Sequence, residues 1–192
     1  MRFVTLRSLS DRGRTMGARP EEEVPMTTQP TLSVALEREH HEIDGGIEEY
    51  AAGLGPSSRY ARSGTGDVDP APLLRAMAAL RRHIYLEEEF IFPPLKDAGM
   101  MMPIFVMLRE HGEIWDAMDR LDAMLASDAD PATQLQACRD LLAQLESHNM
   151  KEEPVIYPQA DAMLSAEATE RLHAFLATGE MPDGWRCEKA SA

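Results

Sequence analysis

The same histidine–glutamate pattern occurs twice in this chain, and this repeat constrains the fold more than any other feature. The segment His-x-x-x-Glu-Glu-x-x-Ile-Phe-Pro at residues 83–93 recurs at residues 148–158 with Tyr in place of Phe. A shorter motif, Glu-His-x-Glu-Ile, precedes each copy, at residues 39–43 and 110–114. The chain is therefore expected to fold as two equivalent halves.

The spacing of apolar residues around these motifs indicates helices. Apolar residues recur three and four positions apart, whereas a strand would show alternation. Helices are expected at residues 31–54, 70–93, 103–127 and 131–156, with a short fifth helix at 165–177. Pro93 and Pro94 are expected to end the second helix, and Pro154 to kink or end the fourth helix beside its motif.

The connections after the second and third helices are short, which favours antiparallel neighbours. The predicted fold is all-α: an up-down-up-down four-helix bundle with an internal two-fold repeat and a short C-terminal helix. The bundle is expected to span residues 31–178, between a disordered N-terminal extension at 1–30 and an irregular tail at 179–192.

Charge and composition exclude several classes of partner. The formal net charge of −14 would repel nucleic acids and anionic membrane surfaces. There is no apolar run long enough to span a bilayer, and none follows the basic N-terminus as a secretory signal would require. Cys138 and Cys187 form neither a disulfide framework nor a metal motif. A cytoplasmic protein is expected, and the sequence names no protein partner.

The repeated motifs supply candidate metal ligands. Four of the six histidines fall on the apolar stripes of the four long helices, and two of these helices add a glutamate four residues later. That spacing places the two side chains one turn apart on one face. The candidate ligands are His40, His83, Glu87, His111, His148 and Glu152. A polar network in the core is the alternative, but such groups are costly to bury without partners.

This donor set suggests how two ions would be held. Glu87 and Glu152 would reach between the ions and bridge them, while the four histidines would be terminal ligands. An oxo, hydroxo or water bridge would complete the centre. Nitrogen and oxygen donors with open positions suit two iron ions, with manganese or zinc as alternatives. Which histidines share an ion stays open at this stage.

These motifs resemble those of the hemerythrin-like HHE cation-binding family, which is named for such His-His-Glu signatures. The resemblance covers about residues 31–160 and both halves of the repeat. It implies a non-haem di-iron centre in a four-helix bundle, with the six candidate residues as ligands.

One position departs from the pattern of the oxygen-carrying hemerythrins. Those proteins have a second His four residues after the first on the third helix, where this chain has Trp115. Trp115 is expected to fill the space of the missing ligand, which argues against reversible oxygen carriage. Asp44, four residues after His40, is a candidate for a compensating carboxylate, with a solvated surface Asp as the alternative.

Two classes of function are compatible with these features. A di-iron module that binds or senses oxygen, nitric oxide or iron is favoured, because the sequence specifies a metal site but no substrate pocket. The alternative is a di-iron enzyme that removes peroxide or performs an oxidation; a zinc or manganese bundle with an interaction role is a third reading. Glu88 and Glu153 are expected on a solvated face, with contacts to the ligating side chains as the alternative. Phe92 and Tyr157 are expected to pack below the site.

Overall fold

The computed structural model describes residues 30–55, 68–127 and 129–191. Within these ranges the regular structure is entirely helical, so the predicted all-α class is confirmed. The predicted N-terminal extension, except for its last residue, and most of the predicted loop between the first two helices lie outside the described residues.

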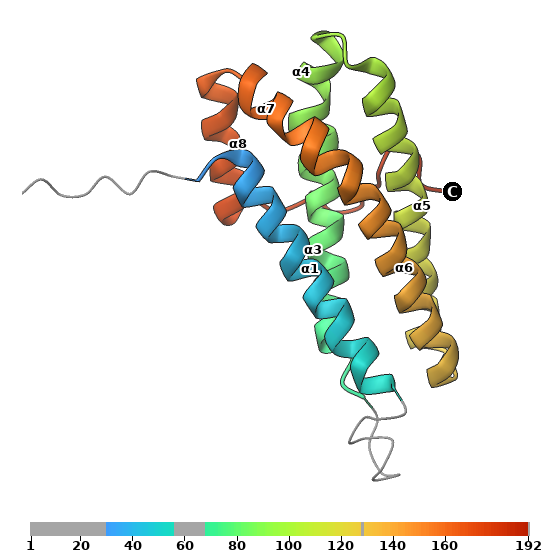
Figure 1. The fold of residues 1–192 in the computed structure, drawn as a ribbon. Coiled ribbons are helices and arrows are strands. Elements are labelled where there is room, and N and C mark those ends of the chain that lie inside the picture. The colour runs from blue at the N-terminus through green and yellow to red at the C-terminus, as the bar shows by residue number, and fades with distance from the viewer. Residues whose placement is uncertain (1–29, 56–67, 128, 192) are drawn as a thin grey trace, which may run out of the picture.

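Four long helices lie side by side and make up the body of the molecule (Figure 1). They are α1 (Leu32–Leu54), α3 (Ala71–Leu86), α5 (Met101–Ala126) and α6 (Pro131–Lys151). Helix α1 packs against α3 and α6, and α5 packs against α6 and α3. This arrangement closes the four helices around a common interior.

The helix starts follow capping chemistry. The side chain of Asp130 accepts hydrogen bonds from the backbone N–H groups of Ala132 and Thr133, and Pro131 occupies the first turn of α6. The hydroxyl of Thr31 accepts from the N–H of Val34 at the start of α1. These side chains satisfy N–H groups that have no partner within the helix.

The predicted helix end at Pro93 and Pro94 is wrong, because the helix continues through a π turn, and the irregularity predicted beside Pro154 is also a π turn. Helix α3 passes through η1 (Glu87–Ile91) into α4 (Phe92–Asp97), and α6 passes through η2 (Glu152–Ile156) into α7 (Tyr157–Met163). Pro93 and Pro94 were expected to end the helix, but they lie in the first turn of α4. A proline at that position does not interrupt the helix, because its missing N–H is not needed there.

Pro154 lies inside η2, yet it is not the cause of the irregularity. The other half of the repeat has Glu89 at the equivalent position and forms the same π turn. A π turn is therefore a shared property of both halves, and it falls on the repeated glutamates. Such turns are often found at functional sites.

Apolar side chains form two clusters along the bundle. One is built around Ile47, Met77 and Met118, and the other around Leu36, Phe92 and Ile104. Helix α8 (Ala166–Thr178), capped by Ser165, adds Leu172 to the second cluster. The residues in each cluster come from several helices, so burial of these side chains holds the helices together.

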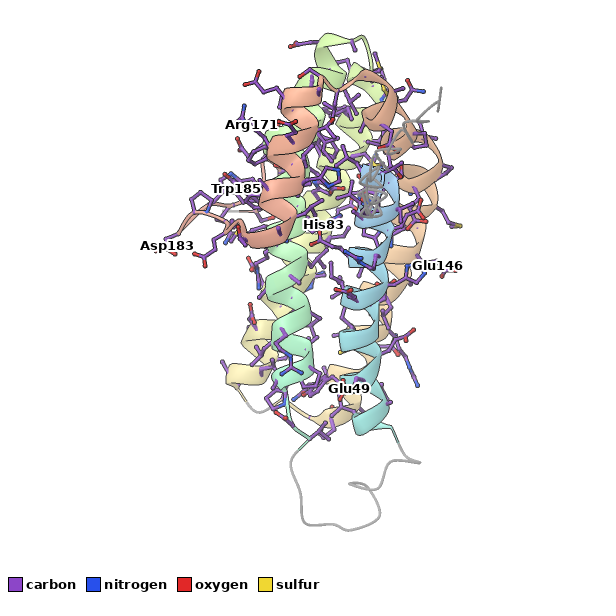
Figure 2. The ribbon with its side chains drawn as sticks, turned by 90° about the vertical axis from the view of Figure 1, so that its left-hand side faces the viewer. Glu49, His83, Glu146, Arg171, Asp183 and Trp185 are labelled. Carbon is purple, nitrogen blue, oxygen red and sulfur yellow. The ribbon has the colours of Figure 1, made fainter. Side chains whose placement is uncertain are left out.

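The C-terminal stretch 179–191 forms no helix but packs against the bundle. The indole N–H of Trp185 donates to Glu89, and the backbone N–H of Glu188 donates to Glu88. A Cβ at Gly112 would clash with the backbone carbonyl of Lys189, so α5 can approach this stretch closely only with glycine there. Figure 2 shows Trp185 at about the same level along the bundle as His83.

Among the described residues, none of the helices is both long enough and apolar enough to cross a bilayer.

Candidate metal centre

The structure brings all six predicted residues together inside the bundle. Each is buried: Glu87, His111 and Glu152 are fully enclosed, and His40, the most exposed, is at 5%. They form two groups of potential ligand atoms that share the same two glutamates. The first group is His40, His83, Glu87 and Glu152, and the second is His111, His148, Glu87 and Glu152. Within each group the ligand atoms lie within 4.8 Å of one another.

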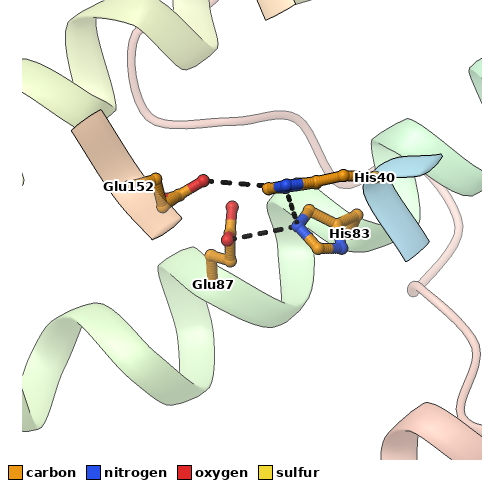
Figure 3. Close-up of side chains that lie close together, drawn as sticks. All are labelled: His40, His83, Glu87 and Glu152. Atoms are coloured by element: carbon orange, nitrogen blue, oxygen red, sulfur yellow. Dashed lines mark hydrogen bonds and ion pairs between the residues drawn. The ribbon is translucent and has the colours of Figure 1, made fainter. Parts of the chain in front are cut away.

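The histidines pair by position in the bundle. His40 from α1 faces His83 from α3, with 3.0 Å between their Nε2 atoms (Figure 3). His111 from α5 and His148 from α6 form the second pair, with ring centroids 5.0 Å apart. The sequence left this pairing open, because it follows from which helices are neighbours.

Each glutamate lies between the two histidine pairs. One oxygen of Glu87 is 3.2 Å from Nε2 of His83, and its other oxygen is 3.2 Å from Nε2 of His111. Oε2 of Glu152 is 3.0 Å from Nε2 of His148 and 3.8 Å from Nε2 of His40. Both carboxylates are thus placed to contact both ions of a two-ion centre.

A second ring of carboxylates lies behind the histidines. Nδ1 of His40 is 2.9 Å from Glu153, and Nδ1 of His83 is 2.9 Å from Glu39. In the other half, Nδ1 of His111 is 2.9 Å from Glu88, and Nδ1 of His148 is 3.1 Å from Glu110. Each histidine therefore has a carboxylate behind it.

Glu88 and Glu153 do not lie on the solvated face that was expected for them, but contact the histidines. The side chain of Glu88 is 5% exposed and that of Glu153 is 31% exposed, and each contacts a histidine of a different helix. The repeat did carry a signal for this role. The acid before each motif histidine and the second acid of each Glu-Glu pair recur in both halves.

The outer carboxylates determine what the inner nitrogens offer. A carboxylate accepts hydrogen bonds, so Nδ1 of each histidine is the protonated nitrogen and, in a neutral imidazole, Nε2 presents a lone pair. When all four imidazoles are neutral, as metal binding requires, four such lone pairs face the carboxylate oxygens of Glu87 and Glu152 in the buried interior. Three of these inner atoms, Oε2 of Glu87, Nε2 of His111 and Oε1 of Glu152, have no hydrogen-bond partner. Cations would satisfy these atoms, so the residues present fit a metal pair.

The electrostatics of the site agree with this reading. Burial alone would lower the pKa of both His83 and His148. Glu87 and Glu39 nevertheless raise the pKa of His83 to about 10, and Glu152, Glu110 and Glu87 do the same for His148. Burial would raise the pKa of Glu87, yet the facing imidazoles hold it well below its ordinary value. Burial and the neighbouring His83 lower the pKa of His40. The inner site is strongly attractive to positive charge.

Tyr157 is part of the site, and the sequence reasoning placed it only below the site. Its hydroxyl oxygen is 2.9 Å from Nε2 of His40, 3.1 Å from Nε2 of His83 and 2.8 Å from Oε1 of Glu87. The π turn explains this position. The N–H of Tyr157 bonds to the carbonyl of Glu152, five residues back, whereas an α-helix would turn Tyr157 about 140° away from Glu152.

Asp44 and Trp115 lie outside the two groups. Asp44 lines a small cavity of about 10 Å³ beside the four histidines, and its Oδ1 has no hydrogen-bond partner. Burial raises the pKa of Asp44 to about 6. Trp115 does not line this cavity. Its buried ring packs against Trp185 and lies under Arg81. That Trp115 fills the space of a missing ligand stays a prediction.

Comparison with known proteins agrees with this geometry. The family model of the hemerythrin HHE cation-binding domain matches residues 31–160, a range that contains every residue of the two groups. The chain therefore belongs to the hemerythrin HHE cation-binding family, as the motifs predicted.

Relatives among curated proteins are mycobacterial. An uncharacterized protein of Mycobacterium tuberculosis and another of Mycobacterium bovis are each 30% identical to the chain over 161 residues. The match covers 77% of this chain and 58% of each relative, so it spans little more than half of their length. No solved structure matches the chain significantly.

Proposed function

We propose that this protein is a non-haem di-iron protein of the hemerythrin type, which binds or senses oxygen, nitric oxide or iron. His40, His83, His111 and His148 would be terminal ligands, and Glu87 and Glu152 would bridge the two irons. The bundle would have the up-down-up-down topology and two-fold repeat that its short connections favour. A cytoplasmic location stays a prediction.

One observation carries this proposal. Four imidazole nitrogens and two shared carboxylates converge in the interior, and each imidazole is oriented by a carboxylate of a neighbouring helix. Such second contacts fix the tautomer of a metal-binding histidine and raise its basicity. Nitrogen and oxygen donors of this kind suit iron, with manganese and zinc as weaker alternatives. The bound metals would supply the redox chemistry.

The small cavity beside the site favours a small ligand. The adjoining cavity holds only about 10 Å³, which is roughly the space for one water molecule. Apart from five of the candidate ligands, its lining is apolar except for Asp44 and Asn149. Five of the six candidate ligands line this cavity, so it adjoins the ion positions directly, and a diatomic molecule or peroxide would need the least rearrangement to enter it.

Metal analysis after aerobic, iron-replete expression tests this function. We expect two irons per chain. No bound transition metal, or stoichiometric zinc, would contradict the di-iron reading. A di-iron enzyme that removes peroxide is the alternative, and a sustained turnover of peroxide by the iron-loaded protein would favour it over a binding or sensing role.

A further inference from the structure

The two halves of the repeat differ at one position inside the site. The residue after the π turn is Tyr157 in the second half and Phe92 in the first half, and both are fully buried. Both residues begin the helix that follows the glutamate of their half. The backbone is therefore equivalent, and only one half carries an oxygen atom there.

The Tyr157 oxygen is spaced like a ligand of the first group. It lies 2.8–3.3 Å from atoms of all four members, His40, His83, Glu87 and Glu152. Adjacent donor atoms on a cation with bonds of about 2.1 Å at right angles are about 3 Å apart. The phenol oxygen thus lies where a fifth donor of the ion held by this group would lie.

Phe92 offers no donor to the second group. Its ring stacks on His111, with centroids 5.3 Å apart and an interplanar angle of 19°. The second group therefore has the two shared glutamates, His111 and His148 as its donors. Two of the inner atoms without partners, Nε2 of His111 and Oε2 of Glu87, face each other on this side.

We propose that Tyr157 is a ligand of the ion held by His40 and His83, and that the ion held by His111 and His148 keeps an open position for the exogenous ligand. This inference rests on the proposed di-iron function and deepens it. Binding of an ion by the Tyr157 oxygen would replace its O–H bond, and the proton would be released to solvent, as occurs when metals bind protonated ligands. The pseudo-symmetric bundle would then hold two chemically different ions.

Vibrational spectroscopy of the ferric protein tests the tyrosine ligand. A phenolate bound to ferric iron gives a visible charge-transfer band, and resonance Raman excitation in that band enhances phenolate ring modes. We expect these modes in the unmodified protein and their loss in Tyr157→Phe. The matched control is Tyr50→Phe, which removes the hydroxyl of another buried tyrosine, hydrogen-bonded to Gln134 away from the site. The control should keep the modes at full intensity.

The iron content distinguishes a failure of the proposed function from a failure of the proposed tyrosine ligand. If the unmodified protein binds no iron, the proposed function is wrong. If it binds two irons but shows no phenolate modes, or if Tyr157→Phe retains them with iron bound, the tyrosine ligand is wrong. Should Tyr157→Phe fail to load iron, the unmodified protein and Tyr50→Phe still decide the matter, because the modes must be present in both.

Mössbauer spectroscopy with azide as the probe tests the open position. We expect two distinct ferric signals of equal area, of which azide shifts one, with one azide bound per chain. Replacement of Tyr157 by Phe should change the other signal. Two azides per chain, or an equal shift of both signals, would contradict an open position confined to the His111 and His148 side.

Discussion

The two shared glutamates are the residues on which a paired centre depends most. Each faces a histidine from both pairs, so each would neutralise charge on both ions. We expect Glu87→Ala to lower the occupancy of both ions together, measured as iron per chain, to well under half of the unmodified value. Glu89→Ala, at an exposed neighbouring position, is the control and should keep two irons. Loss of a single iron in Glu87→Ala would show that Glu87 does not bridge.

The outer carboxylates should matter through the histidines that they orient. Glu88→Gln keeps the shape of the side chain but removes its charge behind His111, which should weaken that imidazole as a donor. We expect iron affinity to fall about 10- to 100-fold, the usual effect of changing such a contact. Competition with a chelator of known affinity measures this. Glu113→Gln, an exposed position on α5, is the control, and equal affinities for the two variants would refute the orienting role.

The sequence predicted the candidate ligands that occur in both halves of the repeat, but not the role of Tyr157, whose counterpart in the first half is Phe92. Four of the six candidate residues were predictable because helical spacing puts a His and a Glu on one face, and His40 and His111 because they lie on apolar stripes in the repeated shorter motif. Tyr157 was not, because its position depends on a π turn, and apolar periodicity assumes α geometry. The outer role of Glu88 and Glu153 depends on which helices are neighbours, which spacing within one helix does not specify.

At the scale of helices, a π turn explains why the predicted helix end at Pro93 and Pro94 was wrong. Pro154 lies in a π turn, whose hydrogen-bond pattern differs from that of an α-helix. The first half forms the same turn with Glu89 at this position, so the turn does not require Pro154. We expect Pro154→Glu, which makes the second half resemble the first, to retain both irons and the phenolate modes. The change should alter the free energy of unfolding by less than about 1 kcal/mol, because this side chain is exposed. Loss of the phenolate modes with iron bound would show that Pro154 positions Tyr157.

At the scale of the whole molecule, the C-terminal stretch is part of the packed structure. Trp185 contacts Tyr85 and Trp115, and Cys187 is buried in the same apolar cluster as the two tryptophans. We expect Trp185→Ala to destabilise the protein by about 2–3 kcal/mol, somewhat less than a fully buried Trp would cost. Denaturant unfolding measures this, with exposed Glu180→Ala as the control. Equal stability of the two variants would mean that this stretch contributes nothing to the fold.

The reactivity of the cysteine thiols also tests whether the C-terminal stretch packs against the bundle. Burial raises the pKa of Cys138 and of Cys187 to about 11, so at pH 8 almost none of either thiol is the reactive thiolate. We expect both cysteines to react slowly with a thiol reagent in the folded protein and rapidly after unfolding. In Trp185→Ala, only Cys187 should become faster. Rapid labelling of Cys187 in the unmodified protein would contradict the docked position of this stretch.

The central claim is that this bundle holds two irons side by side between Glu87 and Glu152. X-ray absorption at the iron edge of the aerobically purified protein tests it most directly, because it detects the neighbours of each iron. The account predicts a shell of nitrogen and oxygen donors and a second iron within roughly 4 Å, the usual spacing in two-metal sites. Iron bound without an iron neighbour, or with sulfur donors, would contradict it.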